Sequence, residues 1–553
     1  MPGMGQPVNS VENFSDQRNI DDLFRFVAGY SAMTPLWEEG PDMLGEELRL
    51  RAPQVADEEF NDFGQMIREA AARHPDKIAV IDEQVSLTWA QFAALVARVA
   101  GRLAERGIGP GARVMSLSEN SAAHLALYAG VLSAGACMVP LPWSASPEAL
   151  TRMRSDCGAG LLFASATHRA VADTLGAEVI ALEELEAFAA GPEAAPVTVT
   201  ADDFFDIIYS SGTTGTPKGI VHEHRFRSRQ FGRFCDLGLD ADAVQIMSTP
   251  LYSNTTLVAV LSGLVGGGCI VSMSKFNTIG FLDLSQRHRA THAMLVPVQY
   301  MRLMAEPTFD DYDLGSYVCK FSTSAPLPGP LIARIMARWP GNLVEFYGMT
   351  EGGVSTVLNC EAHPTKWDTA GSIAEGSEVR IIGEDGQELP PGSYGEIAGR
   401  SGSMMPGYLN APDKTAEATW RDSQGNDFIR TGDMGRLDAD GFLHLLDRKK
   451  DMIITGGFNV YAADLEAVLR AHPAVADVAV IAVPSADWGE TPLALVVAET
   501  PTDAEDLRQW ANARLGKLQR ISAVEFRADL PRSEIGKILK RDLRAPYWSK
   551  ETA

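Results

Sequence analysis

The sequence predicts an α/β protein in which a large N-terminal domain of α/β subdomains and a small barrel-like subdomain precede a small α+β C-terminal domain. At 553 residues the chain exceeds one ordinary core, so we expect more than one domain. From about residue 75 strand-like and helix-like segments alternate, which is typical of a largely parallel, doubly wound sheet. After about residue 370 short strands and turns replace this pattern, which favours an antiparallel or barrel-like subdomain.

The alternation begins with a short apolar strand followed by a capped helix. Thr88 and Gln91 have the spacing of a capping box, which predicts a helix from there to about Arg106. Three further segments continue the pattern by their periodicity. The predicted strands are 78–81, 113–118 and 137–141, and the intervening helix is 121–135.

The most apolar long run, Leu257 to Met273, is interrupted by Ser262 and by three glycines at 266–268. A buried helix, a glycine turn and a strand explain it better than a membrane span does. Near the C-terminus, 466–485 has the pattern of a helix and then a strand, and 503–516 that of a second helix.

These patterns set the predicted domain bounds. The N-terminal domain covers 1–447 and starts with an irregular extension at 1–60, a hinge lies at 448–451, and the C-terminal domain covers 452–553. The charge run DRKKD at 447–451 lies at the boundary, where either a hinge or an ordinary solvated loop fits.

Composition excludes several classes of protein. The apolar fraction of 45% and the charged fraction of 22% are those of a globular protein, and a net charge of −24 argues against a nucleic-acid or anionic-membrane partner. The six cysteines form no C-x-x-C pair, so neither a disulfide framework nor a zinc site is indicated. With no export signal recognised at the N-terminus, we expect a cytoplasmic protein.

The segment Tyr209–His222, YSSGTTGTPKGIVH, predicts a polyphosphate-binding loop after a buried strand. Its glycines let several backbone N–H groups converge on one anion, and the hydroxyl groups and Lys218 add donors and a positive charge. It is not a Walker A loop, because Lys218 is followed by Gly219 rather than Ser or Thr. The loop residues proposed to bind ATP are Ser210, Ser211, Gly212, Thr213, Thr214, Gly215 and Lys218.

Five more motifs follow this loop in a fixed order. They are FYGMTE (346–351), GEI…GYLNAPDKT (395–415), TGD (431–433), DRKKDMIITGGFNVYAADLE (447–466) and PRSEIGKILKRDLR (531–544). The set resembles the adenylate-forming superfamily of acyl-CoA synthetases, peptide-synthetase adenylation domains and luciferases over about residues 60–545. The resemblance implies a mobile C-terminal domain and a reaction in which a carboxylate and ATP give an acyl-adenylate and pyrophosphate. A thiol, that of CoA in the leading interpretation, then takes the acyl group and AMP is released.

The resemblance also assigns roles in the first step. Lys537 would bridge the substrate carboxylate and the α-phosphate, for which a compact ammonium is suited. Thr350 would contact phosphate and Glu351 would bind Mg²⁺, a cation that prefers oxygen ligands. Without the resemblance, Lys537 and Glu351 would be taken as solvated side chains.

Three residues are assigned to the nucleoside and three to the second step. Tyr347 would pack beside adenine, Asp433 would accept from the ribose hydroxyls and Arg448 would contact ribose or phosphate. Lys450 aligns with the hinge. Gly456 and Gly457 would line the path of the CoA thiol, although a hairpin turn explains two glycines equally well.

The acyl pocket departs from the pattern of the superfamily. After Pro250, where an aromatic residue and His are common, the chain has Tyr252, Ser253 and Asn254. Thr323 and Ser324 replace common glycines before YGMTE, and Gly348 is assigned to the same pocket. We therefore expect a narrower and more polar cavity. His222 and His224 lack a third ligand nearby, so we do not predict a metal site there.

The arginines at 225, 227, 229 and 233 are unusual in so acidic a chain. They would form either a solvated helix face or a site for a second substrate carboxylate or the CoA phosphates.

Four interpretations of the function remain open, three enzymes and an inactive homologue. The leading one is an acyl-CoA synthetase that uses ATP, Mg²⁺ and CoA on a small-molecule carboxylate. A stand-alone ligase that loads a carrier protein, a luciferase-like oxygenase and an inactive homologue share the motifs, although the last would be expected to lose Lys218, Asp433 or Lys537. No interface pattern is visible, and a homodimer is left open.

Overall fold

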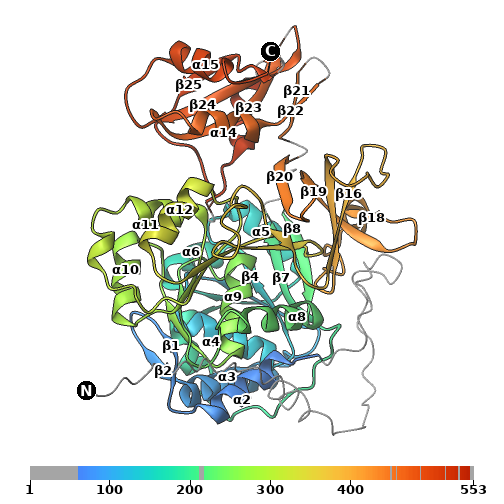
Figure 1. Ribbon diagram of the computed structural model, residues 1–553. Helices are drawn as coiled ribbons and strands as arrows, with labels where there is room; N and C mark the ends of the chain where they lie inside the picture. Colours follow the sequence, from blue (N-terminus) through green and yellow to red (C-terminus); the bar gives the residue numbers. More distant parts are fainter. Residues whose placement is uncertain are drawn as a thin grey trace, which may run out of the picture. The chain divides into compact units, whose positions relative to one another are not determined.

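A computed structural model describes residues 60–210, 217–448, 451–455, 458–485, 487–516, 519–533 and 536–548 (Figure 1). Several predicted features lie outside these residues. They are the extension up to residue 59, the loop residues Ser211, Gly212, Thr213, Thr214 and Gly215, the hinge residue Lys450, and Gly456 and Gly457.

Two largely parallel sheets form the N-terminal α/β region, as the alternating pattern predicts. The larger has nine strands in the order β15 (Ser372–Ile373), β14 (Ser355–Asn359), β13 (Asn342–Gly348), β12 (Cys319–Ser322), β11 (His292–Leu295), β9 (Val244–Met247), β10 (Cys269–Ser272), β1 (Ile78–Ile81) and β2 (Ser86–Thr88). The smaller has six, in the order β6 (Glu178–Ala181), β5 (Leu161–Ala164), β3 (Arg113–Leu117), β4 (Cys137–Pro140), β7 (Phe204–Ser210) and β8 (Lys218–Glu223). The last pair, β7 and β8, is an antiparallel hairpin.

Helices connect and cover these strands. In chain order they are α2 (Phe63–Arg73), α3 (Trp89–Glu105), α4 (Ala122–Ser133), α5 (Pro147–Cys157), α6 (Arg169–Ala172), α7 (Leu185–Phe188), α8 (His224–Cys235), α9 (Asn254–Val265), α10 (Thr278–Arg287), α11 (Pro297–Ala305) and α12 (Gly329–Arg338). The predicted capping box is present, since Thr88 Oγ1 accepts from Gln91 N–H and the Gln91 side chain accepts from Thr88 N–H.

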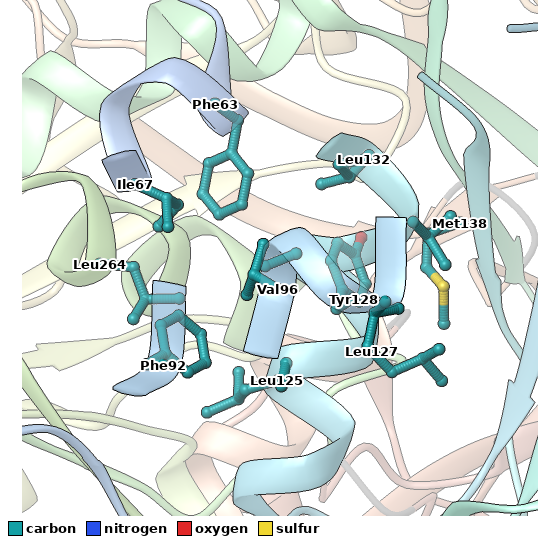
Figure 2. Packing of buried hydrophobic residues seen from close by; sticks show 14 of the residues in the cluster. Phe63, Ile67, Phe92, Val96, Leu125, Leu127, Tyr128, Leu132, Met138 and Leu264 are labelled. Atoms are coloured by element: carbon teal, nitrogen blue, oxygen red, sulfur yellow. The ribbon is translucent and has the colours of Figure 1, made fainter. Parts of the chain in front are cut away.

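The principal apolar core lies between α2, α3, α4 and α9 (Figure 2). Phe63, Phe92 and Val96 meet there, and Leu264 from α9 is buried beside them. Trp89 opens α3 and donates its indole N–H to the carbonyl of Gly267 at 3.0 Å. The apolar run from Leu257 is therefore a buried helix that a glycine turn joins to β10, as predicted. Within the described residues, no helix has both the length and the apolarity to cross a membrane.

After residue 370 the chain forms an antiparallel sheet of β16 (Ser377–Ile382), β17 (Gly395–Ser401), β19 (Asp427–Leu437) and β18 (Thr419–Arg421), with β20 (Leu443–Arg448) paired to β19 and helix α13 (Pro412–Glu417) beside β18. Every strand pairing in this sheet is antiparallel, which agrees with the antiparallel subdomain predicted after residue 370.

The C-terminal region has its own sheet and core, as the helix–strand–helix pattern predicts. The strand order is β22 (Phe458–Val460), β21 (Ile453–Thr455), β24 (Gly489–Ala498) and β23 (Val475–Ser485), and β25 (Ala523–Phe526) pairs with β24. Helices α14 (Ala462–Arg470) and α15 (Ala504–Asn512) supply Leu465, Leu469 and Leu507 to one core, and α16 (Lys540–Trp548) packs against β23.

Candidate active site

The hairpin of β7 and β8 holds the two ends of the predicted phosphate loop together. Ser210, the last residue of β7, is directly opposite Lys218, the first residue of β8. The Lys218 ammonium lies 4.7 Å from the centre of the Tyr408 ring, a distance at which a cation is attracted to the ring face. The lysine is thus held at the mouth of the loop.

Tyr408 also connects Lys218 to the FYGMTE motif. Its hydroxyl donates to Glu351 Oε1 at 2.8 Å, and the backbone N–H of Met405 donates to the Glu351 carbonyl at 2.9 Å. Burial raises the pKa of Tyr408 above its usual value, so the hydroxyl keeps its proton. The sequence analysis missed Tyr408 as a site residue, although it lies within the quoted GYLNAPDKT motif.

Tyr347, Asp433 and Arg448 lie together, as expected of residues that share one nucleoside. The Tyr347 hydroxyl donates to Asp433 Oδ2 at 2.8 Å, and Arg448 Nε lies 3.3 Å from Asp433 Oδ1. Asp433 and Arg448 are opposite each other on β19 and β20. Burial raises the pKa of Tyr347, which fixes it as a hydrogen-bond donor to Asp433.

Thr350 follows β13 in the turn that carries Glu351. Its carbonyl oxygen lies 2.7 Å from Nε2 of His222, which is buried on β8. Because a carbonyl can only accept, Nε2 carries a proton and donates it. The turn of FYGMTE is therefore attached to the hairpin that bears the phosphate loop.

The predicted acyl-pocket residues come from the start of α9 and the segment after β12. Thr255 Oγ1 and Ser324 Oγ lie 2.6 Å apart, which joins the two segments. Ser324 has a φ of 78°, a left-handed conformation uncommon outside glycine, and its neighbour Thr323 is half-buried. Ser253 is the residue before α9, and Gly348, the last residue of β13, is exposed.

Aromatic rings flank these segments. Tyr252 lies edge-on to Trp143 with ring centres 6.1 Å apart. Phe346, which the sequence analysis did not single out, packs 5.1 Å from Phe234 and 6.0 Å from Phe321. These contacts place Phe346 against a small apolar cluster that includes Phe234 and Phe321.

The prediction that the arginine run forms a solvated helix face is wrong for Arg227. This side chain is completely buried and pairs with Asp206 at 2.7 Å. Arg225 pairs with the exposed Asp202, and the Arg229 side chain lies against the backbone of Gly402. A buried Arg227 is also out of reach of the CoA phosphates. Charge and spacing predicted exposure because the compensating Asp206 lies about twenty residues earlier, on another element.

Both ring nitrogens of His222 are engaged, by Asp206 and by Thr350. Across the described segments, no cluster of three or more His, Cys, Asp or Glu residues could hold a metal ion.

Lys537 lies in a tight turn of the C-terminal region. Its backbone N–H donates to Ser533 Oγ at 3.2 Å, and its carbonyl accepts from Ser533 N–H at 2.8 Å. Gly536 has a φ of 77°, and a Cβ there would lie 2.5 Å from Cγ1 of Val298 on α11. This left-handed φ is one that glycine adopts without strain.

Two largely parallel sheets, a hairpin that holds the ends of the predicted phosphate loop, the grouped side chains of Tyr347, Asp433 and Arg448, and a separate C-terminal region are the arrangement expected of an ATP-dependent adenylating enzyme. The chain belongs to the AMP-binding enzyme family: residues 67–409 match that family and residues 464–537 match the AMP-binding enzyme C-terminal domain. The predicted superfamily and fold class are confirmed.

The chain is similar along most of its length to characterised proteins. It is 33% identical to the feruloyl-CoA synthase of Amycolatopsis sp over 86% of this chain and 97% of that protein. It is 30% identical to the fatty acid–[acyl-carrier-protein] ligase ScoC of Streptomyces coeruleorubidus, over 86% and 95% respectively. The crystal structure of ATP-bound MatB from Rhodopseudomonas palustris superposes with a TM-score of 0.79 at 30% identity, covering 88% of this chain and 99% of that one.

Proposed function

We propose that the chain is an acyl-CoA synthetase. It would join a carboxylic acid to the α-phosphate of ATP, release pyrophosphate, and transfer the acyl group from the adenylate to the thiol of CoA with release of AMP. The observation that carries the proposal is the contact of Tyr408 with both Lys218 and Glu351, because it brings a phosphate-binding cation and a carboxylate to one place from three separate motifs.

In the proposed first step, Lys218 and the loop before it hold the β- and γ-phosphates, which leave as pyrophosphate. Tyr347, Asp433 and Arg448 bind the nucleoside. The ammonium of Lys537 balances the negative charges of the substrate carboxylate and the α-phosphate as a carboxylate oxygen attacks phosphorus. The C–O bond of the acid is kept, and the bond between the α-phosphorus and its bridging oxygen breaks.

Glu351 fits the predicted Mg²⁺. Tyr408 occupies Oε1 only, and Oε2 has no hydrogen-bond partner among the residues that the structure describes. One carboxylate oxygen together with substrate phosphates is a common ligand set for this ion. When bound, Mg²⁺ would supply positive charge against the departing phosphates.

For the second step we keep the predicted hinge at Lys450, within 448–451, and the thiol path beside Gly456 and Gly457. Rotation of the C-terminal domain would withdraw Lys537 and present the glycines to the thiol. The cytoplasmic location and the homodimer also stay predictions.

A carrier-protein thiol is the second candidate for the acceptor, since ScoC, similar over most of its length, is named as an acyl-carrier-protein ligase. The acid would be one that tolerates the hydroxyl groups of Ser253, Thr323 and Ser324 and the nearby aromatic rings.

The test is ATP–pyrophosphate exchange with fatty, hydroxycinnamic and dicarboxylic acids, followed by mass spectrometry after addition of CoA. We expect acid-dependent exchange and an acyl-CoA product. Exchange with no acid of the panel would refute the proposal, and exchange without consumption of CoA would favour the carrier protein.

A further inference from the structure

Three charged or titratable side chains meet in the interior of the N-terminal region. Asp206 on β7, His222 on β8 and Arg227 on α8 are all completely buried. Asp206 and His222 are opposite each other in the hairpin, and cross-strand pairs of this kind lie on one face of a sheet. We call these three residues the Asp206 cluster.

The Asp206 cluster is fully hydrogen-bonded. Asp206 Oδ2 accepts from Arg227 Nε at 3.0 Å, from Arg227 Nη2 at 2.7 Å and from the hydroxyl of Tyr128 at 2.8 Å. Asp206 Oδ1 lies 2.5 Å from His222 Nδ1, and Arg227 Nη2 lies 3.0 Å from the same nitrogen. Although burial alone would raise the pKa of Asp206, Arg227 and then His222 lower it on balance. Tyr128 belongs to α4 and to the apolar core (Figure 2).

Two hydrogen bonds and the β7 strand itself lead outward from the cluster to segments of the proposed site. His222 Nε2 donates to the carbonyl of Thr350 at 2.7 Å, next to Glu351. Arg227 Nη1 donates to Asn254 Oδ1 at 2.6 Å, at the first residue of α9. The hairpin itself continues from Asp206 to Ser210, where the phosphate loop begins, about 13 Å along the strand.

Stability alone does not explain such a cluster, because a buried ion pair is often replaced by apolar residues of similar volume without loss of stability. The Asp206 cluster is distinguished by its two hydrogen bonds to the proposed site, one to the backbone carbonyl of Thr350 and one to the side-chain amide of Asn254. Fixing the Thr350 carbonyl restricts rotation of the Thr350–Glu351 peptide. Holding Asn254 by Oδ1 leaves its Nδ2 group as a donor of set orientation, with no acceptor in the part of the chain described.

We infer that Asp206, His222 and Arg227 are positioning residues that hold the phosphate-loop hairpin, the Thr350–Glu351 turn and the acyl-pocket helix α9 in the register that adenylation needs. The inference rests on the proposed function. It also assigns Asn254 Nδ2 as a donor to an acceptor oxygen of the acid.

The test compares His222→Leu, which removes the bond to Thr350, with His222→Gln, whose amide N–H can reach the place of Nε2. Tyr317→Phe is the matched control, since it loses a buried hydrogen bond to Ser285 of 2.8 Å. For each full-length variant, kcat and KM of ATP–pyrophosphate exchange and the Tm are measured. We expect kcat of His222→Leu to fall roughly 10- to 100-fold, the range that a misplacement of up to about 1 Å produces. The KM for ATP should change little, His222→Gln should recover most of kcat, and the control should keep wild-type kcat.

A lowered Tm with wild-type kcat in His222→Leu would overturn the inference, as would an equal loss of kcat in both His222 variants. If the leucine variant does not fold, Asn254→Ala decides. It removes the acceptor of Arg227 at a half-buried position, and unchanged kcat and acid KM would overturn the inference. Wild-type protein without exchange on any acid would instead refute the proposed function.

Discussion

Removing one oxygen atom from Tyr408 tests how Glu351 is held. Tyr408→Phe keeps the ring 4.7 Å from the Lys218 ammonium but deletes the hydroxyl that donates to Glu351 at 2.8 Å. A hydrogen bond to a charged group contributes about 1.5–3 kcal/mol, and 1.36 kcal/mol is a factor of ten in rate. If the whole contribution is felt in the transition state, kcat of adenylation falls roughly 10- to 150-fold. We expect a fall in kcat near the lower end of this range, because a water molecule can take the place of the hydroxyl and donate to Glu351.

The assay is ATP–pyrophosphate exchange over a series of Mg²⁺ concentrations, with Tyr408→Leu beside the phenylalanine variant. The leucine variant also loses the contact with Lys218, which contributes about 0.5–1 kcal/mol, and should be roughly two- to fivefold slower still. We expect Tyr408→Phe to need more Mg²⁺ for half-maximal exchange. Wild-type kcat and Mg²⁺ dependence in that variant would refute the reasoning, because the bond to Glu351 would then have no part in the reaction.

Other perturbations test separate parts of the account. Lys537→Ala should slow adenylation at least about 100-fold, while thioester formation from supplied acyl-adenylate changes far less; comparable losses in both would contradict the two-conformation assignment. Gly352→Ala should destabilise the fold by at least about 2 kcal/mol in urea unfolding, because φ is 75° and the new Cβ would lie 2.0 Å from the Ser403 carbonyl; unchanged stability would refute this packing. Burial raises the pKa of Glu345 to about 8, and its carboxyl accepts from Leu327 N–H. Since the folded state then binds a proton that the unfolded state has lost above its own lower pKa, stability falls as pH rises from about 5 to 8 and is constant above. Glu345→Gln should therefore gain up to about 1.4 kcal/mol per pH unit relative to wild type, measured by chemical denaturation; parallel pH profiles would show that Glu345 is ionised in the folded protein.

The family and the reaction class were predictable because each depends on local motifs. The capping box of Thr88 and Gln91 involves only four consecutive residues, so the start of the helix could be predicted from them. Asp433 could be recognised in the same way, because it belongs to the short TGD motif. The family and the reaction class are confirmed by the comparisons. Tyr347, Asp433 and Arg448 lie together in the structure, and their roles stay predictions.

The Asp206 cluster was not predictable from the sequence. Its members come from two strands and a helix, and their meeting depends on hairpin register and on how α8 packs. An arginine is ordinarily exposed, so the sequence alone favours a solvated Arg227. In the structure Arg227 is buried because Asp206, from another element, compensates its charge. Tyr408 was overlooked for a related reason, since only the fold brings its ring to Lys218 and its hydroxyl to Glu351.

The central claim is that a carboxylate oxygen attacks the α-phosphate of ATP. It is tested most directly with an acid whose carboxylate carries ¹⁸O, by mass spectrometry of the products after turnover with CoA. Attack at the α-phosphate predicts AMP that contains one ¹⁸O atom, together with unlabelled pyrophosphate. Formation of ADP with the label in inorganic phosphate would contradict the account, because the acid would then have attacked the γ-phosphate.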